Sequence, residues 1–206
     1  MDQERQLARD RLLVNTVARD YPGSEVSVSF PDSWQVVHRF RQMNKRLYVA
    51  GMPPSEERSR SDHFHGLSPE INRSLTTYRL YKLFEPRWTP LFQVAWDSRL
   101  GQGQIIGGGR NRVQLQPFGQ AQIWKGERDA VIWECYMFEF GRERSTWREE
   151  LTTFWQAVER DAGVNRIFTQ PHEPTFEEGY PEFLQTLGYA PDPDRERWWT
   201  KDCSVE

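Results

Sequence analysis

Residues 129–163 read DAVIWECYMFEFGRERSTWREELTTFWQAVERDAG, and this stretch decides the fold. In its first part, 130-AVIWECYMFEF-140, apolar residues occupy both sets of alternating positions, and only Glu134 and Glu139 interrupt them. Successive side chains of a strand point to opposite faces, so this pattern places apolar groups on both faces. The sequence therefore predicts a central strand that is covered on each side.

An amphipathic helix is expected directly after this strand. Apolar residues recur at positions 147, 151, 154, 155 and 158, which is the spacing of one helical face. Gly163 predicts the end of the helix, because glycine readily adopts the left-handed conformation that closes helices. The stretch thus predicts a strand, a short polar turn and a helix in direct succession.

The rest of the chain predicts elements of both kinds around this unit. Further strands are expected at 24–30, 91–96, 113–116, 121–124, 164–169 and 196–201. Further helices are expected at 3–20, 34–41 and 179–188. The predicted fold class is α/β (α+β), with a mixed, largely antiparallel sheet flanked by helices and an added N-terminal helix. We expect an N-terminal helical extension at 1–23 and a single domain at 24–206, with a long polar loop at 53–73.

The composition is that of a soluble globular protein, with 206 residues of which 28% are charged and 14% aromatic. No apolar run approaches the roughly 18 residues of a membrane span, and the charged start MDQERQLARDRLL has no signal-peptide core. These features predict a cytoplasmic protein without a membrane partner. Cys135 and Cys203 have no metal-binding spacing, and no disulfide is expected between them.

Charge is distributed unevenly along the chain. Residues 1–126 contain 18 Lys and Arg against 12 Asp and Glu, whereas residues 127–206 contain 9 against 18. A positive excess in the first part indicates either an anionic partner or an ordinary solvated surface, and the sequence leaves both open.

The order of predicted elements from residue 91 onward resembles the GNAT superfamily of acyl-CoA-dependent N-acyltransferases. The stretch 180-YPEFLQTLGYAPDPDRERWWTKD-202 carries most of this resemblance, because its Leu187-Gly188-Tyr189 is similar to the family's FYxxLGF signature. The strand at 24–30 with its following helix is similar to the family's opening unit. The resemblance covers roughly residues 24–203 and implies a GNAT-like fold.

The resemblance also implies a cofactor and a substrate class. The cofactor would be acetyl-CoA or another acyl-CoA, and the substrate an amine acceptor whose identity the sequence does not show. Pantetheine would lie along the strand near 134–140, the pyrophosphate at 141–147, and the acceptor against the loop at 53–73. The implied cofactor-binding residues are Phe138, Phe140, Gly141, Arg142, Arg144, Ser145 and Thr146.

Two interpretations of the turn 141-GRERST-146 stay open. The family's motif here is Q/R-x-x-G-x-G/A, and this chain keeps Arg142 but lacks the glycines that open the backbone to phosphate. As a phosphate site, the turn would rely on arginine side chains instead. The alternative is a capping box in which Thr146 is the N-cap and Glu149 follows three residues later.

An acyltransferase needs a base for the amine and an acid for the departing thiol. Some family members place the base where this chain has Glu134, with Glu139 and His172 as further candidates. The tyrosine that acts as the general acid in the family corresponds to Leu184 in this chain. Leucine has no proton to donate, so Tyr180 is the candidate acid. The alternatives are a Glu134 carboxylate paired with an arginine across the sheet, a solvated His172 and a merely packed Tyr180.

Three other patterns are weaker. GQGQIIGGGR at 101–110 lacks the glycine spacing and the following helix of a dinucleotide-binding loop, so we expect a flexible hairpin there. Asp62, His63 and His65 have no further ligand cluster nearby, and no metal site is expected. The basic residues within 39–60 belong to no nucleic-acid-binding motif, so nucleic acid is not expected as a partner.

A second class of function remains open from sequence. The chain would then be a non-catalytic GNAT-like binding or scaffold protein, in which the loop at 53–73 and the glycine-rich hairpin at 101–110 meet a protein or nucleic-acid partner. The missing glycines and Leu184 favour this class, whereas Arg142 and the strand–turn–helix order favour the enzyme.

Overall fold

The computed structural model describes residues 7, 9, 11–28, 34–42, 45–52, 55–58, 74–97, 102–138, 146–170 and 179–203. For residues 45, 55–58, 84–97 and 102–112 it describes the backbone alone. Within these ranges the helices are α2 (Leu13–Asp20), α4 (Trp147–Ala162) and α5 (Tyr180–Thr186). The strands are β1 (Glu25–Val28), β2 (Gln35–Gln42), β3 (Lys45–Gly51), β4 (Ser55–Arg58), β5 (Ser74–Asp97), β6 (Gln102–Lys125), β7 (Asp129–Met137), β8 (Arg166–Thr169), β9 (Ala190–Pro191) and β10 (Trp199–Asp202).

All of these strands join one sheet in the order β2-β3-β5-β6-β7-β8-β10-β9, with β1 paired to β6 and β4 paired to β5. Pairing is antiparallel except between β7 and β8 and between β1 and β6. β7 lies in the interior of the sheet between β6 and β8, and its residues are mostly buried. The predicted mixed, largely antiparallel sheet flanked by helices is therefore confirmed, and so is the predicted central strand.

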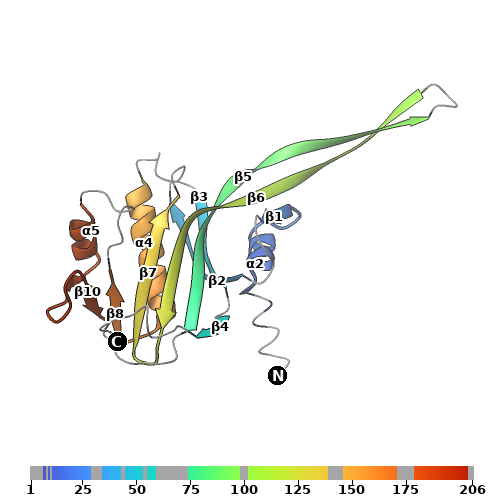
Figure 1. Cartoon of the computed structure of the whole chain (residues 1–206). Helices are drawn as coiled ribbons and strands as arrows, with labels where there is room; N and C mark the ends of the chain where they lie inside the picture. The colour runs from blue at the N-terminus through green and yellow to red at the C-terminus, as the bar shows by residue number, and fades with distance from the viewer. Residues whose placement is uncertain are drawn as a thin grey trace.

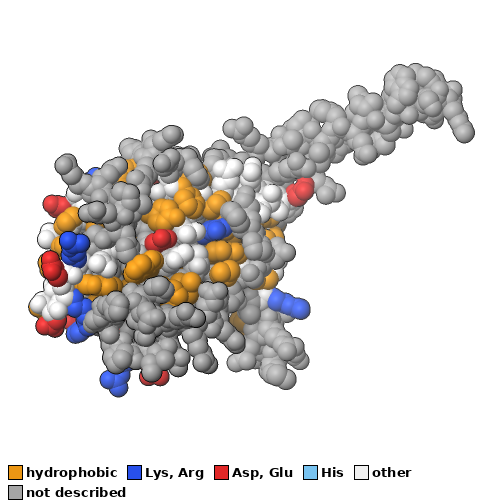
Figure 2. All heavy atoms as spheres, in the orientation of Figure 1, with side chains coloured by type: hydrophobic (Ala, Val, Ile, Leu, Met, Phe, Trp, Pro, Cys, Tyr) orange, Lys and Arg blue, Asp and Glu red, His pale blue; other side chains and the backbone are white. Residues whose placement is uncertain are grey.

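Helices lie on both faces of the sheet (Figure 1). On one face, α4 and α5 pack on the strands in a large core centred on Phe154, Trp155 and Leu184, each fully buried. On the other face, α2 covers β3, β5 and the middle of β6 through Leu13 and Val17. In the view of Figure 2, hydrophobic side chains gather over the central strands, with isolated acidic and basic groups among them.

The longest strands, β5 and β6, form a hairpin that extends well beyond the rest of the molecule in Figure 1. Within the body, β5 also pairs with β3, while β6 pairs with β7 and β1. From the pair Arg87↔Arg112 to the pair Asp97↔Gln102, the two strands pair with each other. β1 pairs with β6 as far as Arg112. Farther out, no described strand pairs with the hairpin.

Several predicted elements differ from the structure. Residues 34–41 were expected to be helical, but they form β2, because their backbone pairs with β3 over its whole length. This also contradicts the expected strand-and-helix opening unit. Residues 102–110 were expected as a flexible hairpin and 113–116 and 121–124 as separate strands, yet all belong to the continuous β6. Within the expected loop at 53–73, residues 55–58 form β4.

The predicted helix at 147–158 and its glycine stop are confirmed. α4 ends at Gly163, which has a φ of 58° in the left-handed region. None of the helices in the described part of the chain is long and apolar enough to cross a membrane.

Candidate functional site

The two parallel strands β7 and β8 separate after a short paired stretch. Their register runs from Asp129↔Arg166 to Ile132↔Thr169 and stops there, although β7 continues to Met137. At the last pair, the buried Thr169 hydroxyl donates a hydrogen bond of 3.0 Å to the Ile132 carbonyl. Residues 133–137 of β7 thus present an edge on the β8 side that no described strand covers.

A β-bulge in β7 lies at the point of separation. Against β6, Gln122 pairs with Glu134 while Ile123 pairs with Ile132, so Trp133 is the extra residue on β7. A bulge bends its strand and increases the local twist. The bulge is therefore the local cause that turns the end of β7 away from the line of β8.

Tyr180 lies on the α4 side of this separation. It is the first residue of α5 and is 6% exposed, in the same core as Cys135 of β7. Burial is the main reason that the pKa of Tyr180 is raised, and its hydroxyl bonds with the Thr169 side chain. Leu184, one turn later on α5, is fully buried in this core.

Glu134 lies on the opposite face of β7. The register places it beside Gln122 of β6, which in turn pairs with Thr77 of β5. Glu134 is half-buried, and no hydrogen bond or ion pair joins its carboxylate to another described residue. Its charge contributes, after burial, to the raised pKa of Tyr136 two residues later. The expected alternative, a pair between Glu134 and an arginine across the sheet, is therefore not seen in the described chain.

The end of β7 is held against β6. The Phe138 amide donates to the Phe118 carbonyl at 2.8 Å, and Phe138 packs edge-on against Tyr136. Opposite Met137 stands Gly119, where a Cβ would lie 2.8 Å from the Tyr136 carbonyl oxygen. Glycine at 119 thus permits the close approach of the two backbones.

Thr146 is the N-cap of α4, as the capping-box interpretation required, but the two hydrogen bonds of the box are not formed. The side chain of Thr146 makes no bond to the first-turn amides, and its hydroxyl donates to the Glu150 carboxylate at 3.4 Å. Glu149 instead accepts a 2.6 Å bond from Gln42 of β2. Glu150 turns inward because it forms a buried ion pair with Lys82 of β5.

The structure describes only some of the predicted site residues. Tyr180 and Glu134 flank the separation of β7 and β8 from opposite faces, while Phe138 and Thr146 mark the two ends of the turn between β7 and α4. The other predicted site residues are Phe140, Gly141, Arg142, Arg144, Ser145 and His172, and they lie outside the described residues, as does Glu139. A hollow of about 550 Å³ lies elsewhere, between α2 and β2.

No family model and no curated protein matches the chain. Among solved structures, the anti-CRISPR protein AcrVA5 is 19% identical, with a TM-score of 0.32, and the match covers 41% of this chain and 90% of that one. An acetyltransferase from Bacillus cereus ATCC 14579 is 12% identical, also with a TM-score of 0.32, and the match covers 69% and 84%. Similarity at this level assigns no family.

Two features of the site were not anticipated from sequence. Thr169 closes the last β7–β8 pair, and a hydroxyl residue at the end of an apolar strand was a usable signal for it. The bulge at Trp133 has no signature in the sequence, because the extra residue becomes visible only when the register against β6 is known.

Proposed function

We propose that this chain is an acyl-CoA-dependent N-acyltransferase whose reaction site lies where β7 and β8 separate. The observation that carries the proposal is the open edge of β7 at residues 133–137, beyond the last pair with Thr169. Buried backbone amides and carbonyls need hydrogen-bond partners. A pantetheine chain is extended and has two amide groups of its own, so it suits an edge of this length.

The first turn of α4 supports the assignment of the cofactor's phosphates to this end of the helix. Because Thr146 does not cap the first-turn amides, these N–H groups at the positive end of a long helix are available to an anion. The ion pair with Lys82 neutralises Glu150, which would otherwise repel the phosphates. Arg142 and Arg144 lie in the preceding turn by sequence, and we assign them as the side-chain partners of the diphosphate.

The residues on the two faces of β7 suit the two proton transfers. The bound acyl-CoA would supply an activated thioester, which an amine can attack. Glu134, without a described partner and on the face of the sheet opposite α4, would accept a proton from that amine, directly or through water. The Tyr180 hydroxyl, which bonds with the Thr169 side chain, is protonated at neutral pH and would donate its proton to the departing sulfur.

Calorimetric titration with CoA and acetyl-CoA tests the proposal. We expect saturable binding that weakens at least about tenfold, or about 1.4 kcal/mol, in Arg142→Ala and in Arg144→Ala. The matched control is Arg128→Ala, which removes an equal charge from the exposed turn between β6 and β7. Absence of binding at millimolar ligand would contradict the enzyme; equal binding by all variants would contradict only the phosphate assignment.

One observation favours the second class, a binding or scaffold protein. The outer part of the β5–β6 hairpin, from Trp88↔Asn111 outward, extends from the body and pairs with no other described strand. Two-stranded ribbons are marginally stable in water, and a partner would stabilise one. Capture of a stable partner through the hairpin, together with no binding of CoA, would favour this class.

A further inference from the structure

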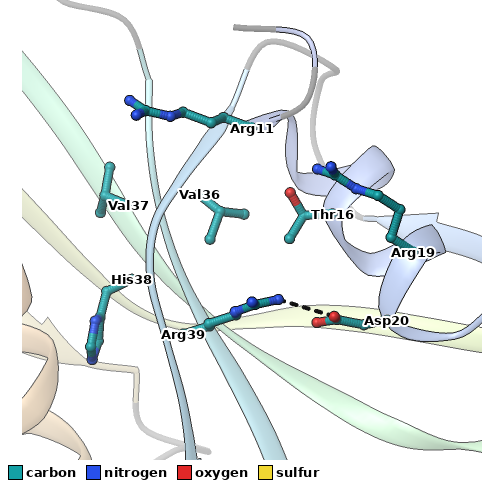
Figure 3. A pocket seen from close by; sticks show the side chains of 8 residues that line it. All are labelled: Arg11, Thr16, Arg19, Asp20, Val36, Val37, His38 and Arg39. Carbon is teal, nitrogen blue, oxygen red and sulfur yellow. Dashed lines mark hydrogen bonds and ion pairs between the residues drawn. The ribbon is translucent and has the colours of Figure 1, made fainter. Parts of the chain in front are cut away.

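The hollow between α2 and β2 is built by the way these two elements are joined. The Leu13 amide donates to the Trp34 carbonyl at 2.8 Å, and Leu12 forms an isolated bridge with Gln35. Between this joint and the ion pair of Asp20 with Arg39, about 550 Å³ lies between the helix and the strand (Figure 3). Thr16 and Val36 lie between the charged residues that surround the hollow.

Positive charge dominates this hollow. Arg11 and Arg19 enter it from the helical segment and Arg39 from β2, whereas Asp20 is the one carboxylate among the lining residues that the structure describes. His38 also lines the hollow. Burial lowers the pKa of its imidazole, and Arg160 of α4 lowers it further, so the neutral form is favoured at neutral pH.

The carboxylate of Asp20 is already fully used. It accepts from Arg39 at 3.0 Å and from the Tyr48 hydroxyl at 2.9 Å, and it pairs with Arg46 at 3.1 Å. These contacts fasten the end of α2 to β2 and β3. Asp20 therefore neutralises no more than part of the charge of Arg39 and Arg46.

A second hollow of about 380 Å³ continues the first along β2. It shares Asp20 and Arg39 with the first hollow and adds Arg41 and Arg46. The described residues that line this joint groove include five arginines and one carboxylate, a formal excess of four positive charges. The side chains of Arg11 and Arg41 have no ion-pair or hydrogen-bond partner among the described residues. These two arginines therefore do not serve to hold α2 against the sheet.

We propose that the groove along β2, between α2 and the strand, binds a small ligand that carries two or more phosphate groups. Guanidinium groups match phosphate oxygens with paired, charge-assisted hydrogen bonds. Several phosphates are required because one dianion would leave half of the groove's excess charge unmatched. The groove is remote in the chain from the residues assigned to the acyltransferase site, and its ligand is independent of that function.

A small polyphosphate suits the groove better than a nucleic-acid strand. Grooves that bind single strands combine positive charge with aromatic rings on which bases stack. Tyr21 lies beside this groove, but the Arg46 guanidinium already covers its ring at 5.2 Å from the centroid. Among the described groove residues, Phe40 is the other ring, and it stacks on His38. The rings beside the groove are therefore already in contact with other side chains.

Tripolyphosphate, titrated calorimetrically at low salt, is the probe that tests this inference. We expect one saturable site whose affinity falls as salt is added, because binding displaces counterions. The double variant Arg11→Gln/Arg41→Gln should bind at least about tenfold more weakly, since it removes two charges without touching the contacts of Asp20. The matched control Arg128→Gln/Arg197→Gln removes two exposed arginines outside the groove and should stay within about twofold.

Three outcomes would overturn the inference. The first is no binding of tripolyphosphate by the wild type at about 1 mM. The second is equal binding by the groove variant and its control, which would move the site elsewhere. The third is a single-stranded oligonucleotide that binds much more tightly and that tripolyphosphate fails to displace, since this ligand would be a strand.

A titration with both ligands keeps this site separate from the acyltransferase proposal. Tripolyphosphate should bind unchanged to protein saturated with CoA, because the two sites share no residue. Loss of tripolyphosphate binding in the presence of CoA would contradict a separate groove site. Failure of CoA to bind, with tripolyphosphate still bound, would contradict the acyltransferase alone.

Discussion

Of the two α5 side chains Tyr180 and Leu184, only Tyr180 can donate a proton. They are one turn apart on α5 and therefore share a face, and both are buried against the end of the paired part of β7. Leu184 has no proton to donate, while the Tyr180 hydroxyl bonds with Thr169 at the point where the strands separate. Tyr180 therefore supplies a hydroxyl where α5 meets this point.

Tyr180→Phe tests that assignment. The ring and its packing are retained, so we expect the Kd for CoA to change little while thiol release from acetyl-CoA, with a panel of primary amines, falls about 10²-fold. Glu134→Gln should lower the same rate and should shift its pH dependence. If Tyr180→Phe keeps the wild-type rate with unchanged stability, the hydroxyl is only a packed group.

The buried tyrosines predict how stability depends on alkaline pH. The pKa is raised, chiefly by burial, for Tyr48, Tyr78, Tyr81, Tyr136, Tyr180 and Tyr189. A raised pKa means that the fold favours the neutral form, so the stabilisation is complete below the unfolded pKa of about 10 and is lost as pH rises beyond it.

An ultraviolet titration of tyrosinate checks this prediction. The chain has 7 tyrosines, and the spectrum should show most of them ionising together, at the pH where circular dichroism reports unfolding. Smooth ionisation of all tyrosines near pH about 10, with the fold intact, would contradict their burial.

At the scale of elements, an ion pair fixes the start of α4 to the sheet. Lys82 of β5 and Glu150 of α4 form this pair with side chains only 2% and 6% exposed, and the Lys82 ammonium also lies 4.5 Å from the centroid of the Phe118 ring. Breaking a buried pair leaves one charge without compensation, which costs more than removing both charges.

A double-mutant comparison tests this pair. Lys82→Met should lower the free energy of unfolding by about 3 kcal/mol or more, whereas Lys82→Met/Glu150→Leu should recover most of the loss. Urea unfolding of both variants measures the difference. Equal destabilisation by the single and the double change would mean that the packing of the lysine stem, rather than the charge pair, matters.

The elements differ in how well the sequence predicts them, and pairing partners explain the difference. α4 has a clean apolar stripe and a glycine stop, both local signals, and its prediction was confirmed. Residues 35–42 carry apolar side chains that suit either a helix or a strand, and the choice is made by pairing with β3. The open edge of β7 depends likewise on two neighbouring strands, so residue types alone indicated Glu134 and Tyr180 but not their opposite faces.

At the scale of the whole molecule, the β5–β6 hairpin divides into two parts with different support. Up to the pair Phe84↔Gln114, the strands lie within a sheet that β1, β3 and β7 continue on either side. Farther out, every described pair from Trp88↔Asn111 to Asp97↔Gln102 is internal to the hairpin. Body and outer hairpin are therefore expected to depend little on each other for stability.

Replacing residues 88–111 by Asn-Gly tests this independence. The two residues form a tight turn that suits a two-stranded hairpin and would join Arg87 to Arg112, leaving all pairs of β1 with β6 in place. We expect the unfolding temperature to change by no more than about 4 °C and the affinity for CoA to stay the same. A collapse of the body, or loss of CoA binding, would contradict this division. Should the protein act by binding a partner through the hairpin, the shortened chain would keep its fold and lose that partner, which separates the two classes of function in one variant.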